Sequence, residues 1–154
     1  MLQQTQVARV IEHYGVFLER FPDPATLARS PLADALALWQ GLGYNRRCLG
    51  LHRAASEIVS RFDGRVPRSV EDLASLPGVG RCTACAVSAF AFGTPAAFIE
   101  TNIRRVFIHW FFPGRKIVHD NEILPLVERT VDRGQPREWY NALMDYGTWL
   151  AGRV

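Results

Sequence analysis

The sequence has few cysteines and no long apolar run. Its three cysteines are Cys48, Cys82 and Cys85, and this small, odd number argues against a disulfide framework. No stretch approaches the roughly 20 apolar residues of a membrane span, and no charged segment followed by an apolar one opens the chain. We therefore expect a protein without a membrane partner, cytoplasmic by default.

Cys82 and Cys85 form a C-x-x-C pattern, which suggests either a metal site or redox chemistry. No second cysteine pair or matching histidine cluster completes a metal site, and the pattern lies within an apolar helical stretch. We therefore interpret both cysteines as small buried side chains.

The composition is that of a globular protein. The 154 residues are 48% hydrophobic and 21% charged, so the chain has enough apolar side chains to form a hydrophobic core. The formal net charge of +3 fits a polyanionic partner such as nucleic acid but does not require one. A basic surface without such a partner is the alternative interpretation.

Apolar residues recur at three- and four-residue steps nearly throughout, whereas strict alternation is scarce. Prolines and glycines separate these stretches, as expected at helix ends. The pattern predicts an all-α protein. Its expected helices are residues 7–21, Pro24–Ser30, Pro31–Gln40, Asn45–Phe62, a short helix from Ser69, Arg81–Phe92, Ile99–Phe112, Asn121–Val131 and Arg137–Leu150.

The segment Leu76-Pro77-Gly78-Val79-Gly80 joins two of the predicted helices and suggests a helix-hairpin-helix. Glycine reaches positive φ at little steric cost, so Gly78 and Gly80 permit a tight turn and a close backbone approach. The amides that open the next helix suit a DNA phosphate, and Arg81 adds a cation there. An ordinary helix–helix turn is the alternative, since Pro-Gly is common in turns.

Further segments occur in the order and spacing of MutY-type adenine DNA glycosylases. They are Met1-Leu2-Gln3-Gln4-Thr5-Gln6-Val7, Trp39-Gln40-Gly41-Leu42-Gly43-Tyr44, Asn102-Ile103-Arg104-Arg105-Val106 and Leu143-Met144-Asp145-Tyr146-Gly147. With the hairpin, they make the chain resemble the helix-hairpin-helix–GPD superfamily of DNA glycosylases over nearly all its length. The match is specific for the superfamily, in its MutY-like and endonuclease III-like branch, and less specific for the substrate base.

The resemblance implies a two-lobed helical glycosylase fold. Residues 1–98 would form a six-helix core lobe that includes the hairpin, and residues 99–154 a second helical lobe. It also implies a monomer that binds double-stranded DNA, flips a nucleotide out of the stack and cuts its N-glycosidic bond.

By the same resemblance, the carboxylate that stabilises positive charge on the sugar stands two residues before Asn102. This chain has Glu100 there, where the family has Asp. The extra methylene moves the carboxylate, and a misplacement of about 1 Å can cost roughly a hundredfold in rate. Two interpretations stay open: the working carboxylate in an adjusted pocket, which we favour, or a residue that only favours the helix N-terminus.

Three other departures from the family pattern bear on the chemistry. Adenine enzymes have a glutamate two residues before the segment that starts here at Met1, so either the start has been set too late, which we favour, or the chain is truncated at its N-terminus. Bifunctional relatives have a lysine at Cys82; a thiol cannot form that imine, so we expect no AP-lyase activity. A nucleophilic Cys82 with a lowered pKa is the alternative. Ala151 replaces the first cysteine of the relatives' iron–sulfur loop, so we expect no such cluster.

The resemblance also suggests DNA contacts. Gln3 matches a residue inserted into the gap left by the flipped base, and Asn102 matches a pocket asparagine. A monovalent cation would be bound by the backbone carbonyls of Ala74, Leu76 and Val79. The phosphate contacts would come from the hairpin residues Pro77, Gly78, Val79, Gly80 and Arg81 and from Arg46 and Arg47, although charged pairs on helices usually form solvated faces.

These observations predict a monofunctional base-excision DNA glycosylase. Adenine opposite 8-oxoguanine is the nearest substrate, and mismatched uracil or thymine is the runner-up. The alternative, motivated by Glu100 and the unseen upstream glutamate, is a non-catalytic helix-hairpin-helix DNA-binding protein.

Overall fold

The computed structural model describes residues 1–2 and 5–153, so Gln3 lies outside the described residues. The described residues contain helices and no strands, which confirms the predicted all-α class. Predicted and observed helices differ only at their ends. The observed ones are α1 (Val7–Arg20), α2 (Pro24–Arg29), α3 (Leu32–Trp39), α4 (Arg46–Phe62), α5 (Val70–Ala74), α6 (Arg81–Phe92), α7 (Thr101–Phe111), α8 (Asp120–Thr130) and α9 (Pro136–Ala151).

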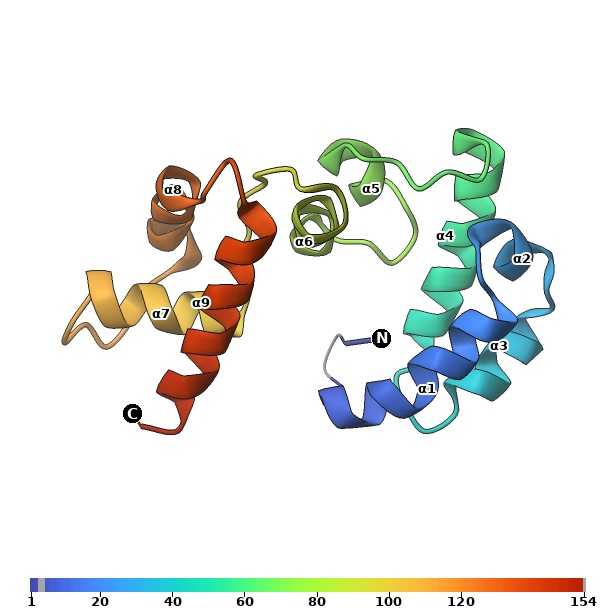
Figure 1. Cartoon of the computed structure of the whole chain (residues 1–154), viewed down its shortest axis with the longest axis horizontal. Coiled ribbons are helices and arrows are strands. Elements are labelled where there is room, and N and C mark those ends of the chain that lie inside the picture. The colour runs from blue at the N-terminus through green and yellow to red at the C-terminus, as the bar shows by residue number, and fades with distance from the viewer. Residues whose placement is uncertain (3–4, 154) are drawn as a thin grey trace. The chain divides into compact units, whose positions relative to one another are not determined.

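Two compact units divide the chain, and Figure 1 labels their helices. The first unit is Met1–Val79, with α1 to α5, and the second is Gly80–Val154, with α6 to α9. The family-based division after residue 98 stays a prediction. In the described part of the chain, no helix is both long enough and apolar enough to cross a membrane.

The core of the first unit is built on aromatic contacts between its first and third helices. Phe17 of α1 packs edge-on against Trp39 of α3, with ring centroids 6.0 Å apart, and also contacts Phe21. All three side chains are buried. The turn into α2 is fixed by Asp23, whose carboxylate accepts a hydrogen bond from the amide of Thr26 at 2.7 Å. The Phe21-Pro22-Asp23-Pro24 break therefore ends one helix and caps the next.

Tyr140 of α9 organises the core of the second unit. Its ring is fully buried and stacks on Phe98 at a centroid distance of 4.2 Å. The hydroxyl donates a hydrogen bond to the carbonyl of Ala96 at 2.8 Å, so the buried polar group is satisfied. Burial raises the pKa of Tyr140 to about 12, so the ring stays neutral. These contacts hold α9 against the non-helical segment that precedes α7.

The helices α7 and α9 approach very closely at Gly147. A Cβ placed on Gly147 would lie 2.5 Å from the Cβ of Asn102 and 2.6 Å from its carbonyl oxygen. Glycine carries no Cβ, so it allows the two backbones to come this near. Gly147 is therefore required by packing, in a helix where its propensity is otherwise unfavourable.

Replacing Gly147 with alanine should destabilise the protein strongly. Overpacking a tight contact costs about 1–3 kcal/mol, and here the added atom meets backbone that cannot rotate away. We expect a fall in melting temperature of at least about 2 °C, at roughly 2–4 °C per kcal/mol for a chain of this size. Differential scanning calorimetry would measure it.

Gly15→Ala is the matched control. Gly15 also lies within a helix, but nothing lies within 4 Å of a Cβ added there. Its replacement should leave the melting temperature unchanged or raise it, because alanine is the better helix former. Equal melting temperatures for the two variants would contradict the close approach.

Candidate functional site

The hairpin turn lies in the first unit and begins at α5. The Ser69 hydroxyl caps α5 by accepting a hydrogen bond from the amide of Asp72 at 3.0 Å. Leu76 is buried, and its carbonyl accepts from the amide of Val79 at 3.1 Å. Gly78 has φ +78°, the left-handed region that side chains disfavour, and it is exposed. The predicted tight turn is therefore present.

Gly50 of α4 is a partner of this turn that the sequence analysis did not single out. A Cβ on Gly78 would lie 3.2 Å from the Cα of Gly50, and a Cβ on Gly50 would lie 3.3 Å from the Cα of Gly78. The turn therefore rests backbone to backbone on the N-terminal part of α4. A glycine inside a predicted helix was the available signal, since it usually marks such an approach.

The other side of the hairpin opens α6 in the second unit. Gly80 is the N-cap of α6 and provides no side chain to bond the first amides, which leaves them for solvent or a ligand. Arg81 follows as the first residue of the helix and is exposed. A helix start of this kind suits an anion. The phosphate contacts of Pro77, Gly78, Val79, Gly80 and Arg81 stay a prediction.

Glu100 is the N-cap of α7. Its Oε1 accepts hydrogen bonds from the amides of Asn102 at 2.6 Å and Ile103 at 2.8 Å. Its Oε2 forms no hydrogen bond with the described residues. The capping interpretation of Glu100 is therefore confirmed. It does not exclude the catalytic interpretation, because one carboxylate oxygen is left for a ligand in a half-buried setting.

Cys82 lies close to Glu100 within the second unit. Its thiol donates to the carbonyl of Ile99 at 3.3 Å. Burial, and then the negative charge of Glu100, raise the pKa of Cys82 above its usual value. The predicted burial of the C-x-x-C pair is right for Cys85 and wrong for Cys82, which is exposed. The raised pKa argues against an activated Cys82 nucleophile, since only the thiolate attacks.

No metal site is visible around this pair. In the part of the chain that the structure describes, no three histidine, cysteine, aspartate or glutamate side chains gather where they could bind a metal ion.

Asn102, in the first turn of α7, packs against Gly147 of α9. Its Oδ1 accepts a hydrogen bond from Nη1 of Arg105 at 2.7 Å, and the same nitrogen donates to the carbonyl of Gly147 at 2.7 Å. Arg105 therefore fastens α7 to α9 next to the close approach at Gly147. The structure gives Asn102 a packing role, and its role in a base pocket stays a prediction.

Arg46 and Arg47, which start α4, differ sharply. The guanidinium of Arg47 donates to the carbonyls of Met1, Leu42 and Gly43 and to the hydroxyl of Thr5, at 2.8–3.2 Å. It therefore holds the N-terminal segment against the loop before α4. Arg46 is exposed and forms no hydrogen bond or ion pair with the described residues, so of the two it is better placed to meet a phosphate. Both DNA contacts stay predictions.

Solved structures with this fold are DNA-processing enzymes. A thermostable thymine-DNA glycosylase superposes with a TM-score of 0.86 and 28% identity, over 95% of this chain and 69% of that one. A trapped endonuclease III–DNA covalent intermediate gives a TM-score of 0.82 at 24% identity, which supports the fold alone. Residues 1–131 match the family described as HhH-GPD superfamily base excision DNA repair protein. The chain belongs to this family, which confirms the resemblance inferred from its motifs.

The most similar curated relatives include adenine DNA glycosylases. The protein of Buchnera aphidicola subsp. Baizongia pistaciae is 36% identical over 97% of this chain, which covers 43% of that protein. The human protein is also 36% identical, over 96% of this chain and 28% of its own length. The chain thus spans less than half the length of these relatives.

The pairing of Cys82 with Glu100 predicts slow alkylation of this thiol. At a pH near the usual thiol pKa of about 8.5, Cys82 should react with iodoacetamide more slowly than the cysteine of a short unstructured peptide, because its raised pKa leaves less thiolate. Cys48 and Cys85 are buried, so the first label on the native protein should be at Cys82. Mass spectrometry would identify the site and give the rate.

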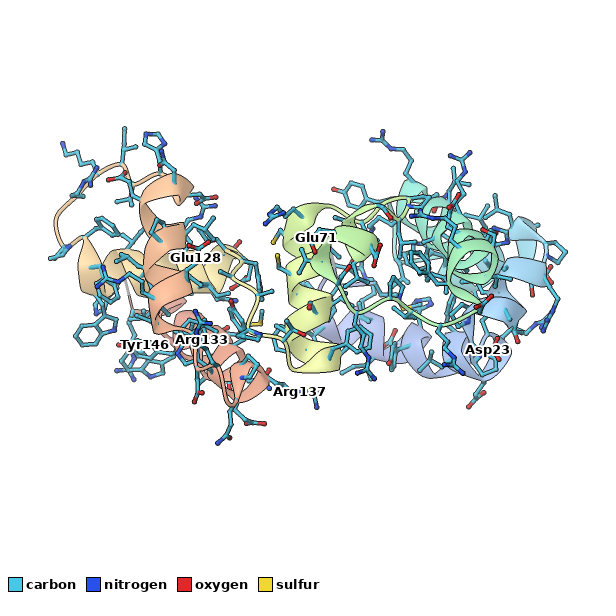
Figure 2. All side chains as sticks on the ribbon, turned by 90° about the horizontal axis from the view of Figure 1, so that it is seen from above. Asp23, Glu71, Glu128, Arg133, Arg137 and Tyr146 are labelled. Atoms are coloured by element: carbon cyan, nitrogen blue, oxygen red, sulfur yellow. The ribbon has the colours of Figure 1, made fainter. Side chains whose placement is uncertain are left out.

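Glu100→Gln removes the negative charge and should speed this alkylation, since the pKa of Cys82 then falls towards its usual value. Glu128→Gln is the matched control, because Glu128 is exposed on α8 (Figure 2). Alkylation of Cys82 faster than that of the unstructured peptide, or insensitive to Glu100→Gln, would contradict the pairing.

Proposed function

We propose that the chain is a base-excision DNA glycosylase that hydrolyses the N-glycosidic bond of a flipped base in double-stranded DNA. The observation that carries the proposal is Glu100, whose Oε1 is fixed by two amides while Oε2 has no hydrogen bond from any residue that the structure describes. A carboxylate held in this way can stabilise positive charge that develops on the sugar without first having to reorganise. Membership of a base excision repair family supports the same chemistry.

Adenine opposite 8-oxoguanine is the proposed substrate. The curated relatives named adenine DNA glycosylase support it, although each is much longer than this chain. Mismatched thymine or uracil is the second candidate. The structural similarity to a thermostable thymine-DNA glycosylase favours thymine.

The proposed enzyme is monofunctional. A lyase reaction needs an amine that forms an imine with the sugar, and the residue next to Glu100 is instead the thiol of Cys82. We further propose a monovalent cation at the hairpin turn, bound by carbonyls of Ala74, Leu76 and Val79. The Leu76 carbonyl accepts from Val79, whereas the other two carbonyls accept no hydrogen bond outside the helices in the described chain. Those oxygens therefore have lone pairs available for such an ion.

Strand-cleavage assays would test the activity. Duplexes with adenine opposite 8-oxoguanine, thymine opposite guanine and uracil opposite guanine should be incubated with the protein, with and without alkali. We expect strand breaks on one of these three substrates, and only after alkali treatment. Glu100→Gln keeps an oxygen for the cap but loses the charge, and should slow base loss by on the order of a hundredfold or more.

Glu128→Gln, the same change at an exposed acid on α8, should leave the rate unchanged. Binding of all duplexes without any breaks would reject the enzyme and favour a non-catalytic DNA-binding protein. Breaks without alkali would reject the monofunctional mechanism.

The hairpin should contribute to affinity independently of sequence. Gly78→Ala adds a Cβ at φ +78° and 3.2 Å from the Cα of Gly50, so the turn must shift. We expect weaker binding to damaged and undamaged duplexes alike, by roughly tenfold, the worth of one charge-assisted hydrogen bond to phosphate. Fluorescence anisotropy at fixed salt would measure it.

Gly114→Ala is the control for backbone strain, because Gly114 has the same φ of +78° but no atom within 4 Å of an added Cβ. Both variants lose stability to strain, so only a loss of affinity specific to Gly78→Ala bears on the hairpin. Unchanged affinity in a folded Gly78→Ala protein would refute its phosphate role.

A further inference from the structure

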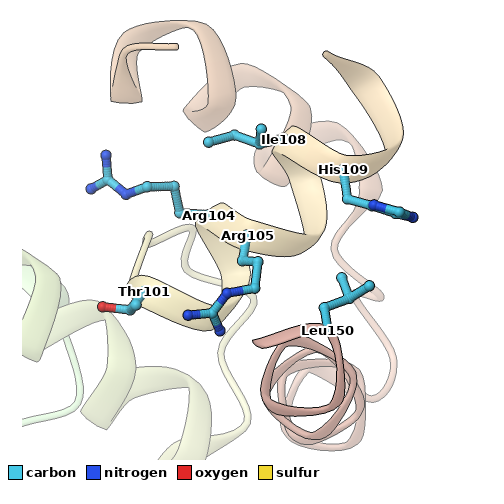
Figure 3. A pocket seen from close by; sticks show the side chains of 6 residues that line it. All are labelled: Thr101, Arg104, Arg105, Ile108, His109 and Leu150. Carbon is cyan, nitrogen blue, oxygen red and sulfur yellow. The ribbon is translucent and has the colours of Figure 1, made fainter. Parts of the chain in front are cut away.

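A pocket of about 330 Å³ on α7 and α9 makes no site for a single small ligand. Its lining is mostly apolar and consists of Thr101, Arg104, Arg105, Ile108, His109 and Leu150. The side chains of Thr101 and His109 point to opposite sides (Figure 3), so one ligand group would not meet both of them together with Arg105. This pocket is therefore assigned no ligand.

The helix α1 (Figure 1) carries four large apolar side chains that the described chain leaves exposed. They are between 42% and 68% exposed. Since a helix turns about 100° per residue, the four lie within an arc of about 60° on one side of α1. Contiguous exposed apolar surface marks an interaction site, whereas single exposed apolar residues do not. We name this set the α1 seam, and its residues are Val7, Ile11, Tyr14 and Leu18.

The α1 seam is the uncovered part of a wider apolar arc. Val10 and Phe17 are buried in the core of the first unit and lie directly beside the seam on α1. With the seam they form an arc of about 120°. A surface helix normally turns an apolar arc of at least about 100° towards its own core. The core here takes one edge of the arc, which leaves the seam for a partner.

The spacing of the α1 seam suits a helix as the partner. Successive seam residues are separated by four, three and four positions. This is the a and d spacing of coiled coils, in which the apolar side chains of one helix fit between those of another. An extended strand places its side chains at a period of two, so it has no matching repeat.

The α1 seam is complementary to itself. Its spacing is the same in both directions along the helix, so in two antiparallel copies Val7 lies opposite Leu18. Ile11 then lies opposite Tyr14, and each layer joins a smaller side chain to a larger one. Parallel copies would instead place two tyrosines in one layer and two valines in another. The antiparallel arrangement also brings opposite ends of the two helix dipoles together, so a second copy of the chain fits the seam.

The charges of α1 lie away from the seam. Every acidic or basic side chain of this fully described helix is more than about 100° from the centre of the seam. Pairing along the seam therefore buries no charge, which would be costly. DNA or an anionic lipid surface would favour a cationic helix, whereas α1 has as many glutamates as arginines. These charged residues are Arg9, Glu12, Glu19 and Arg20.

We propose that this chain forms a homodimer in which two α1 helices pair antiparallel along the α1 seam. Such a contact is isologous, because both copies contribute the same surface. The family resemblance implied a monomer, and the exposed seam argues against that expectation. A helix of 14 residues is about 21 Å long. This makes a small interface, so the dimer should be weak and dependent on concentration. The proposal does not depend on glycosylase activity.

Sedimentation velocity on the whole chain tests the dimer at concentrations from about 1 µM to about 1 mM, the range of weak association. The wild-type mass should rise from 17.4 kDa towards twice that value. Ile11→Glu places a charge in a central layer and should weaken association by roughly thirtyfold or more. Ile11 is exposed in the single chain, so this variant should fold. Circular dichroism would check its helix content.

Val16→Glu is the matched control. Val16 is 51% exposed on the same helix but lies about 170° from the centre of the seam, so its replacement should leave the dimer unchanged.

A charge-swap variant tests the antiparallel register. Ile11→Glu combined with Tyr14→Lys puts opposite charges face to face in an antiparallel dimer, and like charges face to face in a parallel one. Association stronger than that of Ile11→Glu alone supports the antiparallel seam. Association that is no stronger overturns it.

A wild-type chain that stays at 17.4 kDa over the whole range would overturn the proposal. The same holds if Ile11→Glu associates as well as the wild type, or if Val16→Glu abolishes association.

Discussion

The contact on which the second unit depends is the approach of two backbones at Gly147. No side chain fits between α9 and Asn102 there, so the spacing of α7 and α9 is set by the absence of a Cβ. Arg105 then bridges the same point by bonding Asn102 and the Gly147 carbonyl. Glu100 is the N-cap of α7, so the position of its carboxylate depends on how α7 is held at this crossing. The packing and the proposed chemistry thus rest on the same few atoms.

Glu100 shows how one side chain can serve structure and chemistry together. Its Oε1 caps α7 by accepting hydrogen bonds from the amides of Asn102 and Ile103. A capped carboxylate costs little to orient, since the helix needs an acceptor at that point anyway. Desolvation, and then the negative charge of Glu100, raise the pKa of Cys82, so the carboxylate and the thiol are electrostatically coupled.

The helices were predictable from the sequence because their signals are local. Apolar periodicity, the caps at Asp23 and Ser69, and the breaks at proline and glycine all act over a few residues. The site was less predictable because its contacts join distant residues. Nothing near Arg47 in the chain shows that it turns inward to the carbonyls of Met1 and Leu42, while Arg46 beside it stays in solvent. Gly50 and Gly147 carried a weak signal, a glycine inside a helix, but their partners Gly78 and Asn102 depend on tertiary packing.

The helix α7 holds opposite charges near its start, the carboxylate of Glu100 and the guanidinium of Arg105. The two charges do not pair with each other, because each is held by other groups. Glu100 accepts from the first amides of α7, and Arg105 donates to the side-chain oxygen of Asn102 and to the carbonyl of Gly147. Neutral dipoles hold both charges in place, so neither has to pair with the other. A direct ion pair between them would occupy the Glu100 oxygen that the proposed chemistry needs. The bonds of Arg105 to Asn102 and Gly147 thus fix the crossing of α7 and α9 without using the charge of Glu100.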